Sequence, residues 1–125
     1  MKLSNVIELR EVLGEYIDSN INFSTAYKFM KIIEITEKDY QFYIEKTREI
    51  ISTFGKKDDN GELIIEANGS VRIQEENISE AQAKMDEMAD IEVDIPEKYF
   101  IKIEDLEELK ISCRKMRAFM PIIID

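Results

Sequence analysis

The sequence predicts an α+β protein in which an N-terminal long helical hairpin is followed by a small antiparallel β-sheet with short helices. Apolar residues recur every three or four positions through most of residues 4–54, which is the spacing of amphipathic helices. Further along, the Asn68-Gly69 pair separates two short runs that contain β-branched residues, as in a β-hairpin. The stretch "IEVDIP" then alternates apolar and polar residues, as a half-buried strand does.

The length of 125 residues favours a single domain, because a chain of this size supports one hydrophobic core. Within this domain, 1–125, we expect residues 1–55 to form the helical hairpin. Residues 56–125 are then expected to contain a β-hairpin, an acidic helix and strand segment, and a C-terminal helix.

Two N-terminal helices are predicted from capping residues and stop signals. The first is expected to begin at Ser4 as its cap and to end at the polar run 18–20. The second is expected to begin at Ser24 and to end at Phe54, because Gly55 provides a C-terminal stop.

The second helix is either continuous or restarts after Ile35, since Thr36 and Asp39 have the spacing of a capping box. Its apolar stripe is wide. The stripe consists of Phe23, Tyr27, Met30, Ile33, Tyr40, Ile44, Thr47, Ile51 and Phe54, and it is widened by Phe29, Ile32, Phe42, Tyr43 and Ile50. Such a stripe needs more cover than one short helix gives. We therefore expect either that the C-terminal third packs on it or that a homo-oligomer forms through the helical hairpin.

The stretch "GKKDDNGELIIEANGSVRIQ", residues 55–74, raises the question of a calcium loop. Aligned on Gly61, an EF-hand loop would have Lys56 at its first position and Ala67 at its twelfth, where carboxylates are needed. We therefore predict a β-hairpin with a two-residue type I′ turn at Asn68-Gly69. This register sets Ile64 opposite Ile73 and Glu66 opposite Val71.

The remaining elements are short. A third helix is expected to start at Asn77 or Ser79, and the strand "IEVDIP" to stop at its proline. The stretch "YFIKIEDLEEL" begins extended and turns helical at Glu104. Ser112 is expected to cap a last short helix, which Pro121 ends.

The composition argues against most enzyme classes. The sequence contains no histidine, the commonest general base and zinc ligand, and its one cysteine, Cys113, excludes an internal disulfide. We therefore expect a non-enzymatic protein with no metal and no cofactor. No apolar run approaches the ~20 residues of a membrane span, so we expect a soluble, intracellular protein with no membrane association.

The formal charge of −10 is concentrated between residues 75 and 109, which hold thirteen acidic and three basic residues. The candidate partner-binding acidic residues are Asp86, Asp90, Glu92, Glu104, Asp105, Glu107 and Glu108. One interpretation is that such carboxylates form a solvated face. A second is that pairs of them hold magnesium or serve acid–base chemistry. A third interpretation is that they imitate nucleic-acid phosphates and occupy a basic groove of another protein.

The C-terminal "KISCRKMRAFMPIIID" combines basic and apolar residues. The basic residues are Lys110, Arg114, Lys115 and Arg117, which either contact a phosphate or nucleotide or neutralise the acids just upstream. Met116, Phe119 and Met120 are candidate partner-binding residues, because methionine-rich apolar patches adapt to partners. The alternative is that this apolar patch is core.

The stretches "TFGKKDDNGELI", "DIEVDIP", "IEDLEELKIS" and "MRAFMPIIID" follow one another in an order that resembles a family of small phage and prophage proteins of Gram-positive bacteria. That family is known only as a domain of unknown function. The resemblance implies a phage setting, and with it a place in the host cytoplasm, and it carries over no catalytic residues.

Together these features favour a phage accessory protein that acts by protein binding, as an inhibitor or adaptor aimed at a host defence protein through its acidic segment. The expected partner is a host or phage protein, with no direct contact to nucleic acid. The alternative is an oligomeric virion assembly or tail-associated component. A third hypothesis is a carboxylate-metal hydrolase.

Overall fold

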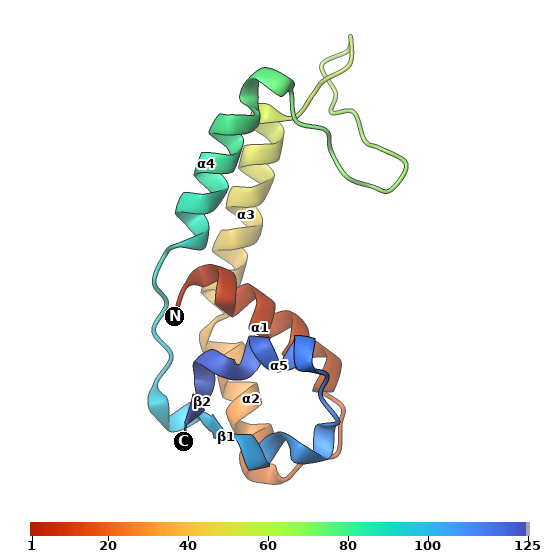
Figure 1. Ribbon diagram of the computed structural model, residues 1–125. Coiled ribbons are helices and arrows are strands. Elements are labelled where there is room, and N and C mark those ends of the chain that lie inside the picture. The colour runs from red at the N-terminus through yellow and green to blue at the C-terminus, as the bar shows by residue number, and fades with distance from the viewer. Residues whose placement is uncertain (125) are drawn as a thin grey trace. The chain divides into compact units, whose positions relative to one another are not determined.

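The computed structural model describes residues 1–124, and it is mainly helical with a small two-stranded sheet (Figure 1). The α-helices are α1 (Leu3–Tyr16), α2 (Phe23–Ile35), α3 (Glu37–Phe54), α4 (Ile78–Ala89) and α5 (Cys113–Phe119). The 3₁₀ helices are η1 (Glu75–Asn77), η2 (Glu97–Tyr99), η3 (Ile103–Leu109) and η4 (Met120–Ile122). The strands are β1 (Ile101–Lys102) and β2 (Ile123–Ile124). The α+β prediction is confirmed at this level.

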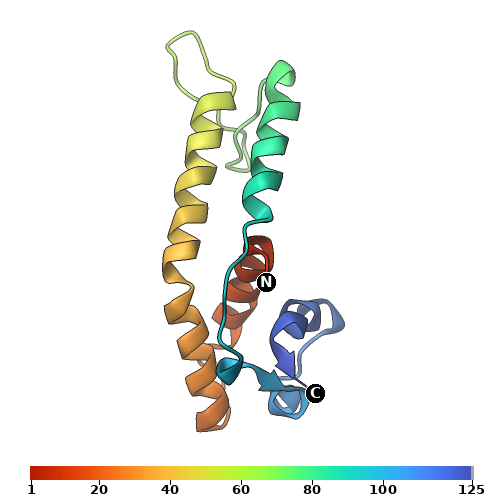
Figure 2. The same ribbon diagram turned by 90° about the vertical axis from the view of Figure 1, so that its left-hand side faces the viewer.

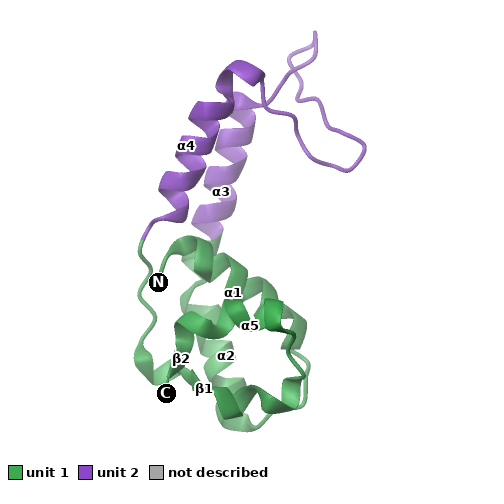
Figure 3. Cartoon of the chain, in the orientation of Figure 1, with its two compact units in different colours: residues 1–40, 92–125 green, residues 41–91 purple. Residues whose placement is uncertain are grey.

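The chain groups into two compact units (Figure 3). Unit 1 contains Met1–Tyr40 and the chain from Glu92 onward, and unit 2 contains Gln41–Ile91. The division falls inside α3, so the predicted helical hairpin over residues 1–55 is not confirmed. The expectation of a single domain stays a prediction.

The sheet in unit 1 is parallel, so the prediction of an antiparallel sheet is wrong. Ile101 of β1 lies opposite Ile123 of β2, and Lys102 lies opposite Ile124. The error arose at the C-terminus, where the isoleucine run was assigned to an apolar patch and not to a strand. Parallel strands need a crossover connection, which η3, α5 and η4 provide here.

The N-terminus of α1 is positioned by backbone pairing and not by the predicted Ser4 cap. Ser4 lies inside the helix, and the N-cap residue Lys2 makes no capping hydrogen bond with its side chain. Lys2 instead forms an antiparallel bridge with Glu92. The N–H of Val93 donates to Met1 O at 2.7 Å, and the N-terminal ammonium donates to Val93 O at 2.9 Å.

Helix α2 buries the side of the predicted stripe that Phe29 and Ile32 widen, and not the side that Phe23 and Met30 occupy. Thr25, Phe29 and Ile32 are buried at spacings of four and three. Two members of the predicted stripe, Phe23 and Met30, are 93% and 52% exposed. Both faces of α2 are apolar, so periodicity alone did not distinguish the face that packs.

The core of unit 1 is formed by α1, α2, α5 and η4, together with the chain from Ile95 to Leu109. Its buried members are Leu9, Val12, Leu13, Phe29, Ile32, Ile95, Ile101, Leu106, Leu109, Ala118, Phe119 and Ile122. The rings of Phe29 and Phe119 stack with centroids 5.8 Å apart, which connects α2 to α5.

Helices α2 and α3 are separated by one residue, Thr36, which agrees with a restart after Ile35. The hydroxyl of Thr36, which is fully buried, donates to Ile32 O at 2.6 Å. A threonine that bonds back to the preceding turn bends a helix. The expected stop at Phe54 is confirmed, but Gly55 has no positive φ there.

Arg10 of α1 holds the junction at Thr36. Its Nη1 donates to Ile33 O at 2.6 Å and to Thr36 Oγ1 at 2.8 Å, and its Nη2 donates to Glu37 Oε2 at 2.8 Å. The guanidinium also lies 4.6 Å from the centre of the Tyr40 ring. One side chain, only 13% exposed, therefore joins α1 to the end of α2 and the start of α3.

The pairing predicted for residues 55–74 in unit 2 is wrong: it is off by one residue at Val71, and Ile73 bridges Gly55 and not Ile64. Ile65, not Glu66, bridges Val71. Asn68-Gly69 belongs to a three-residue loop in which the N–H of Gly69 donates to Glu66 O at 2.9 Å, and Gly69 has a φ of 85°. This is a type I turn followed by a left-handed residue. The extra loop residue places Ile65, which is 67% exposed, opposite Val71.

We predict that Arg10→Met lowers the free energy of unfolding by about 2–3 kcal/mol, because Ile33 O and the Thr36 hydroxyl lose a charged donor. Urea denaturation measures this change. The matched control is Arg48→Met, which alters an exposed arginine of α3 and should change the free energy by less than about 0.5 kcal/mol. Equal effects of the two substitutions would contradict the assigned role of Arg10.

Candidate functional site

The seven candidate acidic residues are divided between the two units. Asp86 on α4 and Asp90, which caps its C-terminus, lie in unit 2, while Glu92 and the four acids of η3 lie in unit 1. Asp86 Oδ1 accepts from Gln82 Nε2 at 2.8 Å. Glu92 Oε2 lies 3.4 Å from the N-terminal ammonium. These carboxylates therefore have partners within the fold.

Asp105 caps the start of η3, where its Oδ2 accepts from the N–H of Lys102 at 3.0 Å. The other three carboxylates of this helix, Glu104, Glu107 and Glu108, are exposed, and we call them the η3 acids. Within residues 1–124, no ion pair forms at any of the three. Among the seven candidate acids, the η3 acids are therefore a group that is exposed and available to a partner.

One interpretation expected the C-terminal basic residues to neutralise the acids just upstream of them. Within the described chain, the two of these residues that form ion pairs do so with acids of α1. Lys115 on α5 pairs with Glu15 of α1, and this hydrogen bond raises the pKa of the Lys115 ammonium. Arg117 Nε lies 3.9 Å from Glu8 Oε1, also on α1. Both ion pairs connect α5 to α1 on the protein surface, where such contacts contribute little stability.

The predicted apolar patch is largely core. Phe119 is fully buried against Phe29, and Met116 is half-buried against the core. Met120 is 56% exposed, so it alone of the three candidates projects into solvent. The assignment of Phe119 to a partner-binding surface is therefore wrong, because its ring fills the space between α5 and α2.

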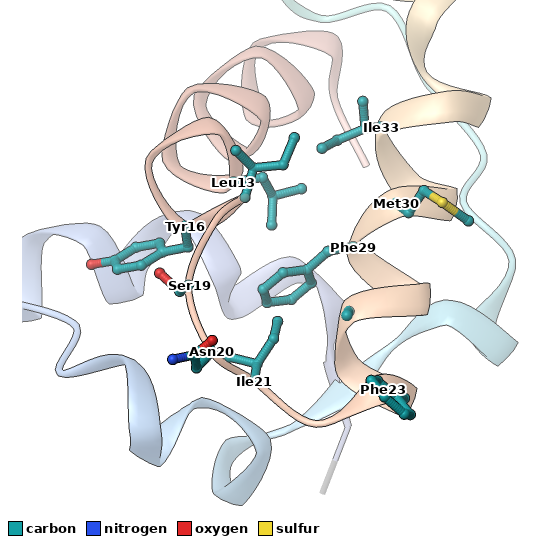
Figure 4. A pocket seen from close by; sticks show the side chains of 11 residues that line it. Leu13, Tyr16, Ser19, Asn20, Ile21, Phe23, Phe29, Met30 and Ile33 are labelled. Atoms are coloured by element: carbon teal, nitrogen blue, oxygen red, sulfur yellow. The ribbon is translucent and has the colours of Figure 1, made fainter.

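An open, apolar pocket of about 420 Å³ lies in unit 1 between the end of α1 and the start of α2 (Figure 4). Its wall contains Leu13, Ile17, Phe23, Phe29, Met30 and Ile33, and we call it the α1–α2 pocket. Figure 4 shows the Phe29 ring projecting into this space, below Leu13 and Ile33. Polar atoms come from Ser19 and Asn20 of the loop that joins the helices.

The rim of the α1–α2 pocket exposes large apolar side chains. Phe23 is 93% exposed, Ile17 65% and Met30 52%. Single exposed apolar residues are common on protein surfaces, but a cluster beside an apolar pocket is typical of a binding surface. Phe23 and Met30 are exposed because the other face of α2 is used for the core, and Ile17 follows the end of α1.

A basic and aromatic hollow adjoins the pocket, and Phe23 borders both. The rings of Tyr27 and Tyr99 are 6.5 Å apart. Lys98 Nζ lies 5.1 Å from the centre of the Tyr99 ring, and Lys28 also borders this hollow. Positive charge therefore lies beside the apolar pocket in a chain whose formal charge is −10.

Sequence reasoning missed the α1–α2 pocket because Phe23, Tyr27 and Met30 were assigned to a buried stripe. The available signal was the second apolar face of α2, formed by Thr25, Phe29 and Ile32, since a helix with two apolar faces leaves one uncovered unless it is central.

Comparisons with protein-family models, with curated proteins and with solved structures give no match to this chain. The resemblance to small phage proteins stays a prediction. Among residues 1–124, no helix is long and apolar enough to cross a membrane. In the same described part of the chain, no group of three or more cysteine and carboxylate side chains could hold a metal ion.

We predict that millimolar calcium leaves the thermal midpoint unchanged, since a ligand that binds the native state must raise it. Asp58 Oδ1 already accepts from the N–H groups of Asn60, at 2.9 Å, and Glu62, at 3.0 Å. Differential scanning calorimetry checks the prediction. A rise of several degrees that Asp58→Ala abolishes, and that the neighbouring Asp59→Ala retains, would show a calcium site in this turn.

Proposed function

We propose that this chain acts by binding another protein, as an adaptor or inhibitor and not as an enzyme, and that its contact surface is the α1–α2 pocket with its basic rim. The observation that carries the proposal is the near-complete exposure of Phe23 beside an apolar pocket. The resemblance to small phage proteins adds a setting, in which the partner is a host or phage protein.

The exposed apolar area supports binding of useful strength. Burying a fully exposed large apolar side chain contributes about 1.5–3 kcal/mol, and Phe23, Ile17 and Met30 are 93%, 65% and 52% exposed, so together they supply about 3–6 kcal/mol before the costs of association. Aromatic residues at the centre of a contact carry a large share of binding energy. A single apolar anchor of the partner, seated against Phe29, would complete such a contact.

The charges beside the pocket define the chemistry of the partner. Lys28 and Lys98 border the hollow next to Phe23, and Lys31 Nζ lies 5.6 Å from the centre of the Tyr27 ring. Charge complementarity favours carboxylates opposite such a rim. The proposed partner element is therefore an amphipathic helix whose large apolar side chains are flanked by acidic residues.

The η3 acids support a second candidate surface with the opposite charge preference. Glu104, Glu107 and Glu108 are exposed and form no ion pair among the described residues. They would suit a basic groove of a nucleic-acid-binding host protein, the phosphate-like role expected of the acidic segment. Contacts of this kind weaken steeply with salt.

A pair of synthetic helical peptides tests the proposal. Both carry Phe and Leu anchors, and they differ only in having Glu or Lys beside the anchors. We predict that the Glu peptide binds about tenfold more tightly by fluorescence anisotropy, and that Phe23→Asp weakens its binding by about tenfold or more. Because Phe23 is 93% exposed, the substitution should leave the thermal midpoint unchanged.

The matched control reverses Glu104, Glu107 and Glu108 to Lys and should leave binding of the Glu peptide intact. It retains Asp105, whose carboxylate caps η3. Tighter binding of the Lys peptide that is lost in the triple variant would move the contact surface to the η3 acids. Failure of both peptides to bind at ~100 μM would contradict the proposal, since that limit corresponds to only about 5.5 kcal/mol.

A further inference from the structure

A groove lies between α3 and α4 in unit 2. Helix α4 runs alongside α3 in the opposite direction (Figure 1, Figure 2). The groove has a volume of about 290 Å³. Phe42, Ile50, Met88 and Ile91 supply its apolar side chains, and Lys46, Glu49, Lys84 and Glu87 supply its charges. We call these eight residues the α3–α4 groove.

Unit 2 buries few large apolar side chains of its own. Phe54 and Met88 are buried, together with the small Ala81, whereas Phe42 is 40% and Ile91 41% exposed. Ile44 and Ile51 of α3 are half-buried. Two isolated helices share a single interface, which leaves part of a wide apolar stripe uncovered. The exposed groove residues therefore have area to gain from a further helical layer.

The charges of the α3–α4 groove are self-complementary. Each helix contributes one lysine and one glutamate three residues apart: Lys46 and Glu49 on α3, and Lys84 and Glu87 on α4. Lys46 Nζ pairs with Glu49 Oε2 at 3.1 Å, on the surface, where the pair can exchange partners at little cost.

A second copy of the same surface can be placed against the first in two twofold arrangements, and in both of them lysines face glutamates. When the twofold axis is parallel to the helices, α3 faces α4 of the second copy, and Lys46 meets Glu87 while Glu49 meets Lys84. When the axis crosses the helices, each helix faces its own copy in the antiparallel direction, and Lys46 meets Glu49 while Lys84 meets Glu87. Both arrangements are isologous, as closed dimers require.

We propose that the α3–α4 groove is the interface of a homodimer, in which two α3–α4 pairs form a four-helix bundle. The apolar residues Phe42, Ile50 and Ile91 fill the centre, and the two Lys–Glu sets define the register at the rim. This surface is separate in sequence from the α1–α2 pocket, so the dimer neither requires nor excludes the proposed partner.

Complementary charge variants test the dimer. Lys46→Glu with Lys84→Glu makes the rim entirely acidic, and Glu49→Lys with Glu87→Lys makes it entirely basic. Sedimentation equilibrium of the full chain should show a dimer for the unmodified protein. Each variant alone should have a dimer dissociation constant at least about tenfold higher, because like charges then face each other. An equimolar mixture of the two variants should restore the dimer.

A matched control changes charge outside the groove. Lys38→Glu with Lys56→Glu gives the same net charge as the acidic variant and should leave the dimer intact. Circular dichroism confirms that all variants keep their helices. An unmodified protein that stays monomeric at ~100 μM, a dimer that persists in both variants, or a mixture that stays monomeric would each overturn the proposal.

Discussion

The guanidinium of Arg10 is the interaction on which the arrangement of unit 1 depends most. At one junction it binds Ile33 O, Thr36 Oγ1 and Glu37 Oε2, and it covers the Tyr40 ring. A buried carbonyl and hydroxyl at an interrupted helix need a donor, and a planar group with several donors can serve them together. The contact therefore stabilises the interruption at Thr36 and fixes the distance between α1 and α2.

That distance creates the candidate binding surface. Phe29 and Ile32 of α2 face the core shared with α1 and α5, so the opposite face of α2 has to point outward. Near its N-terminus this outward face carries Phe23, and the α1–α2 pocket opens between it and Ile17 at the end of α1. The same packing that buries one apolar face of α2 thus exposes the other.

Local signals in the sequence predicted where the elements begin and end better than they predicted which elements contact one another. The Ser112 cap, the restart after Ile35 and the end of α3 are decided by neighbouring residues, so they could be read from the chain. The face on which α2 packs, the parallel pairing of β2 and the partners of Arg10 depend on residues more than twenty positions away. For the same reason Phe119 was misplaced, since its partner Phe29 lies on another helix.

The central claim is that Phe23 and its neighbours form a contact surface, and chemical-shift mapping by solution NMR tests it most directly. Titration of the isotope-labelled full chain with the Glu-flanked helical peptide should shift amide signals of residues 17–30. Signals of η3 (Ile103–Leu109) should stay in place. Shifts confined to η3, or no shifts at peptide concentrations of several hundred micromolar, would contradict the account.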